Sequence, residues 1–219
     1  MKKPQVLTKI QKEFLECFGR NELSKSFYLT GGTALSEYYI PYRYSEDLDF
    51  FSENEINKEA IVVFLRSIKR KLNYITYDEN TSFNRNIFVL SFKEYLLKTE
   101  FTYFPFPQIE TPKVTDGIKV DSITDIAVNK LFTIYQKPRS RDFMDLYMIC
   151  RKYGFSLDEL AKKARIKFDW HIDQLKLGSQ FLLAKELKDF PRLIVSMDDK
   201  DWQDFFLKEA RKLKEKIMV

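Results

Sequence analysis

"YLTGGTALSEYYIPYRYSEDLDFF", residues 28–51, contains the pattern that decides the fold. A short apolar run leads into Gly31 and Gly32, which interrupt it. Residues 33–39 are then predicted to form a helix, and residues 47–51 read as a strand that carries two acids among bulky apolar side chains. The stretch therefore predicts a strand, a glycine turn, a helix and a return to a second strand.

The two acids, Asp47 and Asp49, are one residue apart. Alternate residues of a strand point to the same face, roughly 6.6 Å apart, so the two carboxylates share a face while Leu48 and Phe50 take the other. Two carboxylates this close repel each other and need neutralisation. Mg²⁺ binds through one or two carboxylates together with substrate phosphates, so the pair predicts a magnesium site. A polar outer strand face is the alternative.

The glycine turn suits an anion. Gly31 and Gly32 allow the backbone to approach a phosphate closely, amides at the start of the next helix point at it, and the Thr33 hydroxyl adds a donor. The turn is not a Walker A loop, because no Lys-Ser/Thr follows the glycines. A phosphate cradle beside a metal site favours nucleotidyl transfer, in which metal ions bridge the phosphates and stabilise the leaving pyrophosphate.

A two-metal site usually takes a third carboxylate from a neighbouring strand. The strand predicted over 96–104 offers Glu100, which alternation places on one face with Lys98 and Thr102. A Glu100 side chain that simply faces solvent is the alternative.

The rest of the chain divides into a mixed part and a helical part. Further helices are predicted over 5–19 and 58–71, and further strands over 27–29, 74–77, 87–92 and 118–120. After residue 121 nearly everything reads as helix, over 122–135, over 141–152 and from about residue 198. We expect an α/β (α+β) fold with a nucleotidyltransferase core over 1–120 and a helical region over 121–219.

Two charged residues fall inside the apolar stripes of consecutive predicted helices, Lys130 and Asp142. Because a buried charge is costly unless paired, they suggest a shared site or a mutual ion pair. Alternatives are a snorkelling Lys130 and an Asp142 that stabilises the helix dipole. Between the helices Arg139 and Arg141 could contact phosphates, whereas for Lys137 an exposed basic turn is favoured.

Composition bounds the class of protein. The chain has 219 residues, 44% of them hydrophobic, and a net charge of +5, which suits a polyanionic substrate but also ordinary solubility. With only Cys17, Cys150 and His171, a zinc site of the usual Cys/His kind is excluded. The longest apolar run, residues 60–65, is too short to span a bilayer, so we expect a soluble, cytoplasmic protein without membrane contact.

Three pieces of the sequence resemble the AbiEii/AbiGii-type nucleotidyltransferase toxins of bacterial toxin–antitoxin systems, within the DNA polymerase β-like superfamily. The resemblance is anchored over 28–51 and 120–147. The matching pieces are "GGTAL" followed by "RYSEDLDFF" (Arg43, Ser45, Asp47, Asp49), "NKLFTIYQ" (Lys130) and "RSRDFMDLY" (Arg139, Arg141, Asp142, Asp145).

The resemblance implies roles for these residues. Asp47 and Asp49 would bind Mg²⁺, Lys130 would contact phosphate, and Asp142 would position or activate the acceptor. The expected nucleotide-binding residues are Gly31, Gly32, Thr33, Arg43, Ser45, Arg139 and Arg141, and Glu100 is the candidate third metal ligand.

The implied reaction transfers a nucleoside monophosphate from an NTP to RNA, such as a tRNA acceptor end, and blocks growth, with a cognate antitoxin as partner. A second interpretation keeps the chemistry but changes the acceptor to a small molecule or a protein side chain. A third is a degenerate fold that serves as a partner-binding module, and the intact acid pair argues against it.

Overall fold

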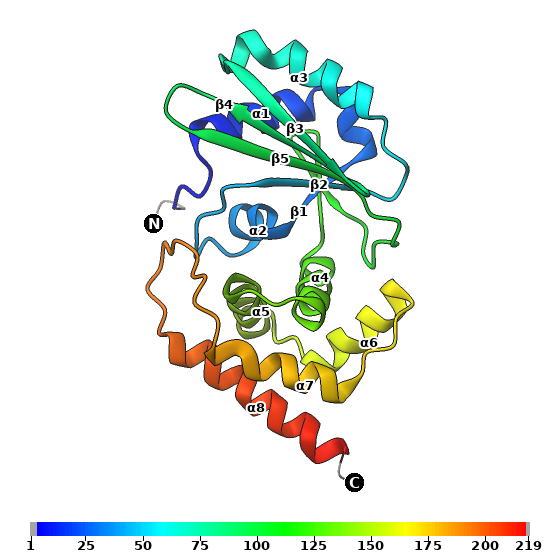
Figure 1. Ribbon diagram of the computed structural model, residues 1–219, viewed down its shortest axis with the longest axis vertical. Coiled ribbons are helices and arrows are strands. Elements are labelled where there is room, and N and C mark those ends of the chain that lie inside the picture. Colours follow the sequence, from blue (N-terminus) through cyan, green and yellow to red (C-terminus); the bar gives the residue numbers. More distant parts are fainter. Residues whose placement is uncertain (1–3, 218–219) are drawn as a thin grey trace. The chain divides into compact units, whose positions relative to one another are not determined.

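The structure is a computed structural model that describes residues 4–217. The chain divides into two compact units, one ending at Ser122 and the other beginning at Ile123. The first unit contains the sheet, and the described part of the second is helical (Figure 1). No helix among residues 4–217 combines the length and apolar character needed to cross a membrane.

The first unit is built on a mixed sheet with the strand order β3-β4-β5-β2-β1-β7-β6. Its strands are β1 (Tyr28–Thr30), β2 (Leu48–Ser52), β3 (Thr76–Ser82), β4 (Arg85–Ser91), β5 (Leu96–Tyr103), β6 (Lys113–Thr115) and β7 (Ile118–Val120). Strand β2 lies antiparallel to β1 and parallel to β5. The α/β fold is confirmed, although β6 was not predicted and β3 lies later than the predicted strand over 74–77.

Three helices of the first unit, α1, η1 and α3, begin where a side chain accepts a hydrogen bond from a free first-turn amide. They are α1 (Lys9–Gly19), η1 (Glu22–Ser26), α2 (Gly31–Ala34), which continues as η2 (Leu35–Tyr39), and α3 (Lys58–Leu72). At α1 the Thr8 hydroxyl accepts from the Gln11 amide at 3.2 Å, and the Gln11 side chain accepts from the Thr8 amide at 2.9 Å. This capping box starts the helix at Lys9, so the predicted start at residue 5 was too early.

An aromatic core covers one face of the sheet. Phe50 of β2 and Phe101 of β5 stack with ring centroids 5.0 Å apart. Phe14 and Phe18 of α1 pack onto Phe50, and Phe64 of α3 packs onto Phe14 and Phe18. Figure 1 shows α3 and α2 on opposite sides of the sheet. Because strand residues alternate, Asp49 projects from the face of the sheet opposite to that of Phe50.

The helical unit has its own core. Its elements are α4 (Ile123–Gln136), α5 (Ser140–Tyr153), α6 (Leu157–Phe168), α7 (Gln174–Leu182), η3 (Leu183–Lys185) and α8 (Asp199–Ile217). Phe206 of α8 packs against Phe143 of α5 and Phe181 of α7, at centroid distances of 4.7 and 5.3 Å. An ion pair at 2.7 Å between Lys167 and Asp125, both with fully buried side chains, was not predicted from the sequence.

Candidate functional site

The diglycine turn opens directly into a helix. Helix α2 begins at Gly31, immediately after β1, and not at residue 33 as predicted. Gly31 adopts a φ of +71°, a conformation that other residues seldom adopt. The N-cap residue, Thr30, makes no side-chain cap hydrogen bond. Its hydroxyl instead donates to the buried Asp121 carboxylate at 2.7 Å, so the first turn receives no side-chain cap from Thr30.

Gly31 lies against the carboxylate of Asp49. A Cβ placed on Gly31 would come within 2.7 Å of Asp49 Oδ2, and the antiparallel β1–β2 register pairs Thr30 with Asp49. The turn and the acid are thus adjacent because β1 and β2 are hydrogen-bonded neighbours. The structure thus places the glycine turn next to Asp49.

Gly32 packs against Arg43 and Ser45. A Cβ on Gly32 would overlap the Arg43 guanidinium and come within 3.0 Å of Ser45 Oγ. Arg43 is only 4% exposed, and its Nη1 donates to the Tyr44 carbonyl at 2.9 Å. In this structure Arg43 supports the turn from within the protein, so its predicted contact with nucleotide is not prearranged.

The Thr33 hydroxyl is also used internally. Thr33 is fully buried, and its Oγ1 donates to the main-chain carbonyl of Asp47. In this structure the hydroxyl ties α2 to the residue that precedes β2, and its contact with a phosphate stays a prediction.

Glu100 is placed beside the acid pair. The parallel β2–β5 register pairs Asp49 with Glu100, so both side chains project from the same face of adjacent strands. Glu100 is only 5% exposed, which rules out the solvent-facing alternative. Burial alone would raise the pKa of Glu100, but hydrogen bonds from Arg85 and Thr102 outweigh it and lower that pKa below its usual value. Glu100 is therefore held as a carboxylate.

Basic side chains pair with the carboxylates of Asp47 and Glu100. Lys98 Nζ lies 3.0 Å from Asp47 Oδ2, and Arg85 grips Glu100 through Nε at 2.6 Å and Nη2 at 2.7 Å. Lys98 was expected on the face of Glu100, but its pairing with Asp47 was not predicted, and no local signal pointed to Arg85.

The three predicted metal ligands are not gathered around one point. Across residues 4–217 no group of three or more Asp, Glu, His or Cys side chains is arranged to share a metal ion. The predicted set of Asp47, Asp49 and Glu100 is therefore not assembled in this conformation. Its chemistry still fits a hard divalent cation, because carboxylate oxygens project from one face of adjacent strands.

In the helical unit, Lys130 and Asp142 form the mutual ion pair that was one of the two expectations. Lys130 Nζ lies 2.7 Å from Asp142 Oδ1 and 2.7 Å from Asp145 Oδ2. Lys130 is 8% exposed and both aspartates are fully buried, so the snorkelling interpretation is wrong. Asp142 also lies in the first turn of α5. Asp145 belongs to the quoted motif, but its contact with Lys130 was not foreseen.

Arg139 is the second cation on Asp142. Its Nε donates to Asp142 Oδ2 at 2.9 Å, and its own side chain remains 45% exposed. Burial opposes ionisation of Asp142, but the charges of Lys130 and Arg139 together with their hydrogen bonds lower its pKa. Of the other basic candidates nearby, Arg141 is half-buried and Lys137 is exposed.

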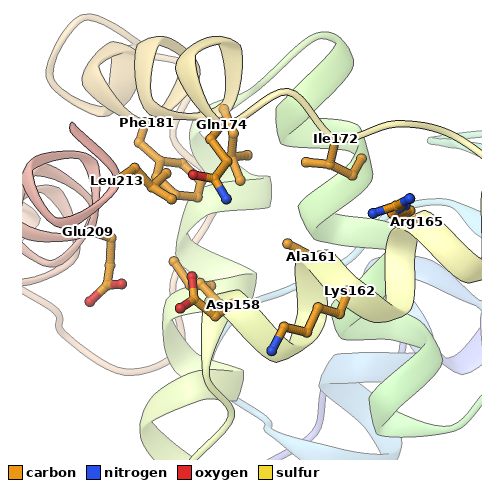
Figure 2. Close-up of a pocket in the computed structure, with 11 residues that line it drawn as sticks. Asp158, Ala161, Lys162, Arg165, Ile172, Gln174, Phe181, Glu209 and Leu213 are labelled. Atoms are coloured by element: carbon orange, nitrogen blue, oxygen red, sulfur yellow. The ribbon is translucent and has the colours of Figure 1, made fainter. Parts of the chain in front are cut away.

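A separate cavity of about 330 Å³ lies within the helical unit (Figure 2). It is lined by Phe181 of α7 and Leu213 of α8, with Asp158 and Lys162 contributed by α6. None of the predicted site residues lines it.

The sequence resembles a described protein family and a bacterial relative. The chain matches the sequence model of the family described as nucleotidyl transferase AbiEii toxin, type IV toxin–antitoxin system, over residues 13–215. An uncharacterised protein of Aquifex aeolicus (strain VF5) is 32% identical over 165 residues, which are 74% of this chain and 76% of that protein.

Two solved structures from Helicobacter pylori share the fold. The protein JHP933 superposes with a TM-score of 0.63 at 22% identity, over 96% of this chain and 91% of that one. A protein described as a nucleotidyltransferase gives a TM-score of 0.61 at 24% identity, over 96% of this chain and 94% of that one. At such identities the likeness establishes the fold alone, whereas the family match covers most of the sequence. The chain therefore belongs to the AbiEii family of nucleotidyltransferase toxins of toxin–antitoxin systems.

Proposed function

We propose that this nucleotidyltransferase transfers a nucleoside monophosphate from an NTP to an RNA acceptor, tRNA in particular, in a Mg²⁺-dependent reaction. The observation that carries the proposal is the contact of Gly31 with the Asp49 carboxylate. It joins the turn suited to a triphosphate to the face suited to a divalent cation. Family membership implies an NTP substrate and a cognate antitoxin.

Asp47 and Asp49 would hold the cation, with Glu100 beside Asp49 as a further ligand. When bound, Mg²⁺ supplies charge neutralisation across the phosphates and the leaving group. The amides at the start of α2, from Gly31 onward, would bind the triphosphate, because first-turn amides have no partner within a helix. Thr33 keeps this turn in place by holding the Asp47 carbonyl.

Lys130 and Asp142 take their proposed roles from the family resemblance: Lys130 contacts phosphate, and Asp142 positions or activates the acceptor. What supports a defined role is the buried network that fixes both side chains. Arg139 and Arg141 remain candidates for phosphate contact, since Arg139 is partly exposed even while it pairs with Asp142.

The proposed acceptor of the nucleoside monophosphate is RNA. A net charge of +5 is compatible with RNA, and NTP and tRNA meet in the cytoplasm, where we place the reaction. A small-molecule or protein acceptor is the competing possibility, and salt distinguishes them. Contacts to several phosphates make RNA binding fall steeply with salt. For a single strand, the logarithm of the binding constant changes with the logarithm of the salt concentration with a slope of about −0.7 per phosphate contact.

The test is a screen of four labelled NTPs against purified tRNA, total RNA and lysate protein, with Mg²⁺ or with chelator. We expect label in tRNA, dependent on Mg²⁺ and lost in Asp49→Ala. Asp78→Ala is the matched control, because Asp78 is an exposed acid of β3 in the same unit and should leave transfer unchanged. Label in protein alone, or full activity of Asp49→Ala, would reject the proposal.

A further inference from the structure

Two basic side chains of the sheet are paired with the acids of the proposed cation site. Asp47 is held by Lys98 of β5, and Glu100 is held by Arg85 of β4 through two hydrogen bonds. Neither basic residue has a role in the proposed reaction so far, and neither lies in the sequence motifs that resemble the family.

Strand register accounts for both pairs. The parallel β2–β5 register sets Leu48 opposite Thr99, so the preceding residues, Asp47 and Lys98, meet on the opposite face. The antiparallel β4–β5 register sets Arg85 opposite Thr102, two residues from Glu100 and on the same face. Diagonal neighbours of this kind are within reach of long side chains. Strand pairing thus places a basic side chain beside each of these two carboxylates, Lys98 beside Asp47 and Arg85 beside Glu100.

Acids and bases differ in exposure. The Glu100 side chain is 7% exposed and that of Asp47 is 28% exposed, whereas Arg85 is 53% and Lys98 35% exposed. Glu100 is thus far more buried than Arg85, whereas Asp47 and Lys98 are exposed to a similar degree. Both basic side chains have long, flexible stems. The pKa of Arg85 is raised, mainly by its hydrogen bond to Glu100 and with a contribution from the charge of Asp49. The charges of Glu100 and Asp49 both act on the Arg85 guanidinium.

Lys98 and Arg85 pair with two members of the acid row formed by Asp47, Asp49 and Glu100. A divalent cation on these carboxylates competes with Lys98 and Arg85 for the same oxygens. Once displaced, both basic groups remain on the face where the proposed triphosphate binds, and they favour an anion there.

We propose that Arg85 and Lys98 are exchangeable counter-ions, which hold the carboxylates when no cation is bound and pass to the triphosphate when a cation takes their place. The inference rests on the proposed function, because it assumes that the acid row binds a cation and a nucleotide. An exchange of counter-ions makes binding of the two ligands cooperative. When the cation binds alone, breaking the ion pairs costs free energy, and the nucleotide offsets part of this cost because it gives the released groups new partners.

The experiment separates the two ligands. Mn²⁺ serves as an EPR probe for the cation, titrated with and without a non-hydrolysable NTP analogue against the wild type, Lys98→Gln and Arg85→Gln. We expect Mn²⁺ alone to bind both variants about threefold to fivefold more tightly, the factor for an ion pair of at most about 1 kcal/mol. The Mn²⁺–nucleotide complex should bind about tenfold more weakly, and KM for NTP should rise correspondingly.

Lys58→Gln is the matched control. Lys58 pairs with Glu79 at 2.7 Å in the same unit and is similarly exposed, at 41%, so the variant changes net charge equally without touching the acid row. Its Mn²⁺ and nucleotide affinities should equal those of the wild type. Arg85→Lys keeps the charge and should retain most of the nucleotide affinity. If Arg85→Gln fails to fold, the half-exposed Lys98 pair decides the question alone.

Unchanged affinities in Lys98→Gln, or weaker binding of both Mn²⁺ alone and the nucleotide complex, would overturn the inference. Asp49→Asn separates this outcome from failure of the proposed function. If Asp49→Asn binds Mn²⁺ as well as the wild type does, the acid row is not the cation site, whatever the basic variants do.

Discussion

Gly31 lies so close to the Asp49 carboxylate across the β1–β2 pair that there is no room between them for a methyl group. The contact determines how closely the helix-opening amides approach the acids. It also makes the absence of a side chain at residue 31 a functional requirement of the proposed site, beyond the requirement set by its positive φ.

Gly31→Ala should reduce nucleotide transfer about 100-fold, the scale on which a misplacement of about 1 Å costs activity. The new Cβ would lie 2.7 Å from Asp49 Oδ2 and force the carboxylate or the turn to move. Gly154→Ala is the control, since Gly154 has the same φ of +71° and nothing within 4 Å of an added Cβ. Equal losses of activity in the two variants would show that backbone strain alone is responsible.

Thr33→Val should lower the free energy of unfolding by about 1–3 kcal/mol, because it leaves the Asp47 carbonyl without its buried donor. Thr33→Ser keeps the hydroxyl and should lose less. Urea unfolding followed by circular dichroism measures both. A Val variant as stable as the Ser variant would mean that the tie between α2 and residue 47 contributes nothing.

The Asp142 network predicts a pH dependence of stability. The folded pKa of Asp142 is below its ordinary value of 3.8, so its contribution is complete above about pH 4 and is lost as pH falls through the folded pKa. At pH 7 Asp142→Asn should be less stable than the wild type by about 3 kcal/mol, since it leaves the buried Lys130 with one fewer anion. That difference should shrink below pH 3.8, as measured by urea midpoints. A difference independent of pH would contradict the ion-pair account.

The buried pair of Lys167 and Asp125 predicts strong non-additivity. Lys167→Met alone should cost about 3–5 kcal/mol of stability, because it leaves a buried carboxylate without its cation. Lys167→Met combined with Asp125→Leu should recover most of that loss. Lys163→Met, at an exposed position of α6, controls for the loss of a lysine charge. A double variant less stable than Lys167→Met would show that the pair is not the main partner of either residue.

Much of the candidate site follows from the sequence because it depends on short-range periodicity. Alternation in a strand puts Asp47 and Asp49 on one face, and helical periodicity turns Lys130 and Asp142 inward, whatever surrounds them. The diglycine turn between a strand and a helix is likewise a local property, and only the first residue of the helix was misplaced. The α/β order and the helical second part rest on the same patterns.

Tertiary structure decided which residues meet. That Glu100 stands beside Asp49, that Arg85 and Lys98 hold the acids, and that Lys167 finds Asp125 all depend on pairings between segments far apart in the chain. Periodicity determines which face a side chain takes, but the neighbour on that face depends on strand order and register. These are selected by burial of the whole core, here the Phe50–Phe101 stack, and no local pattern encodes them.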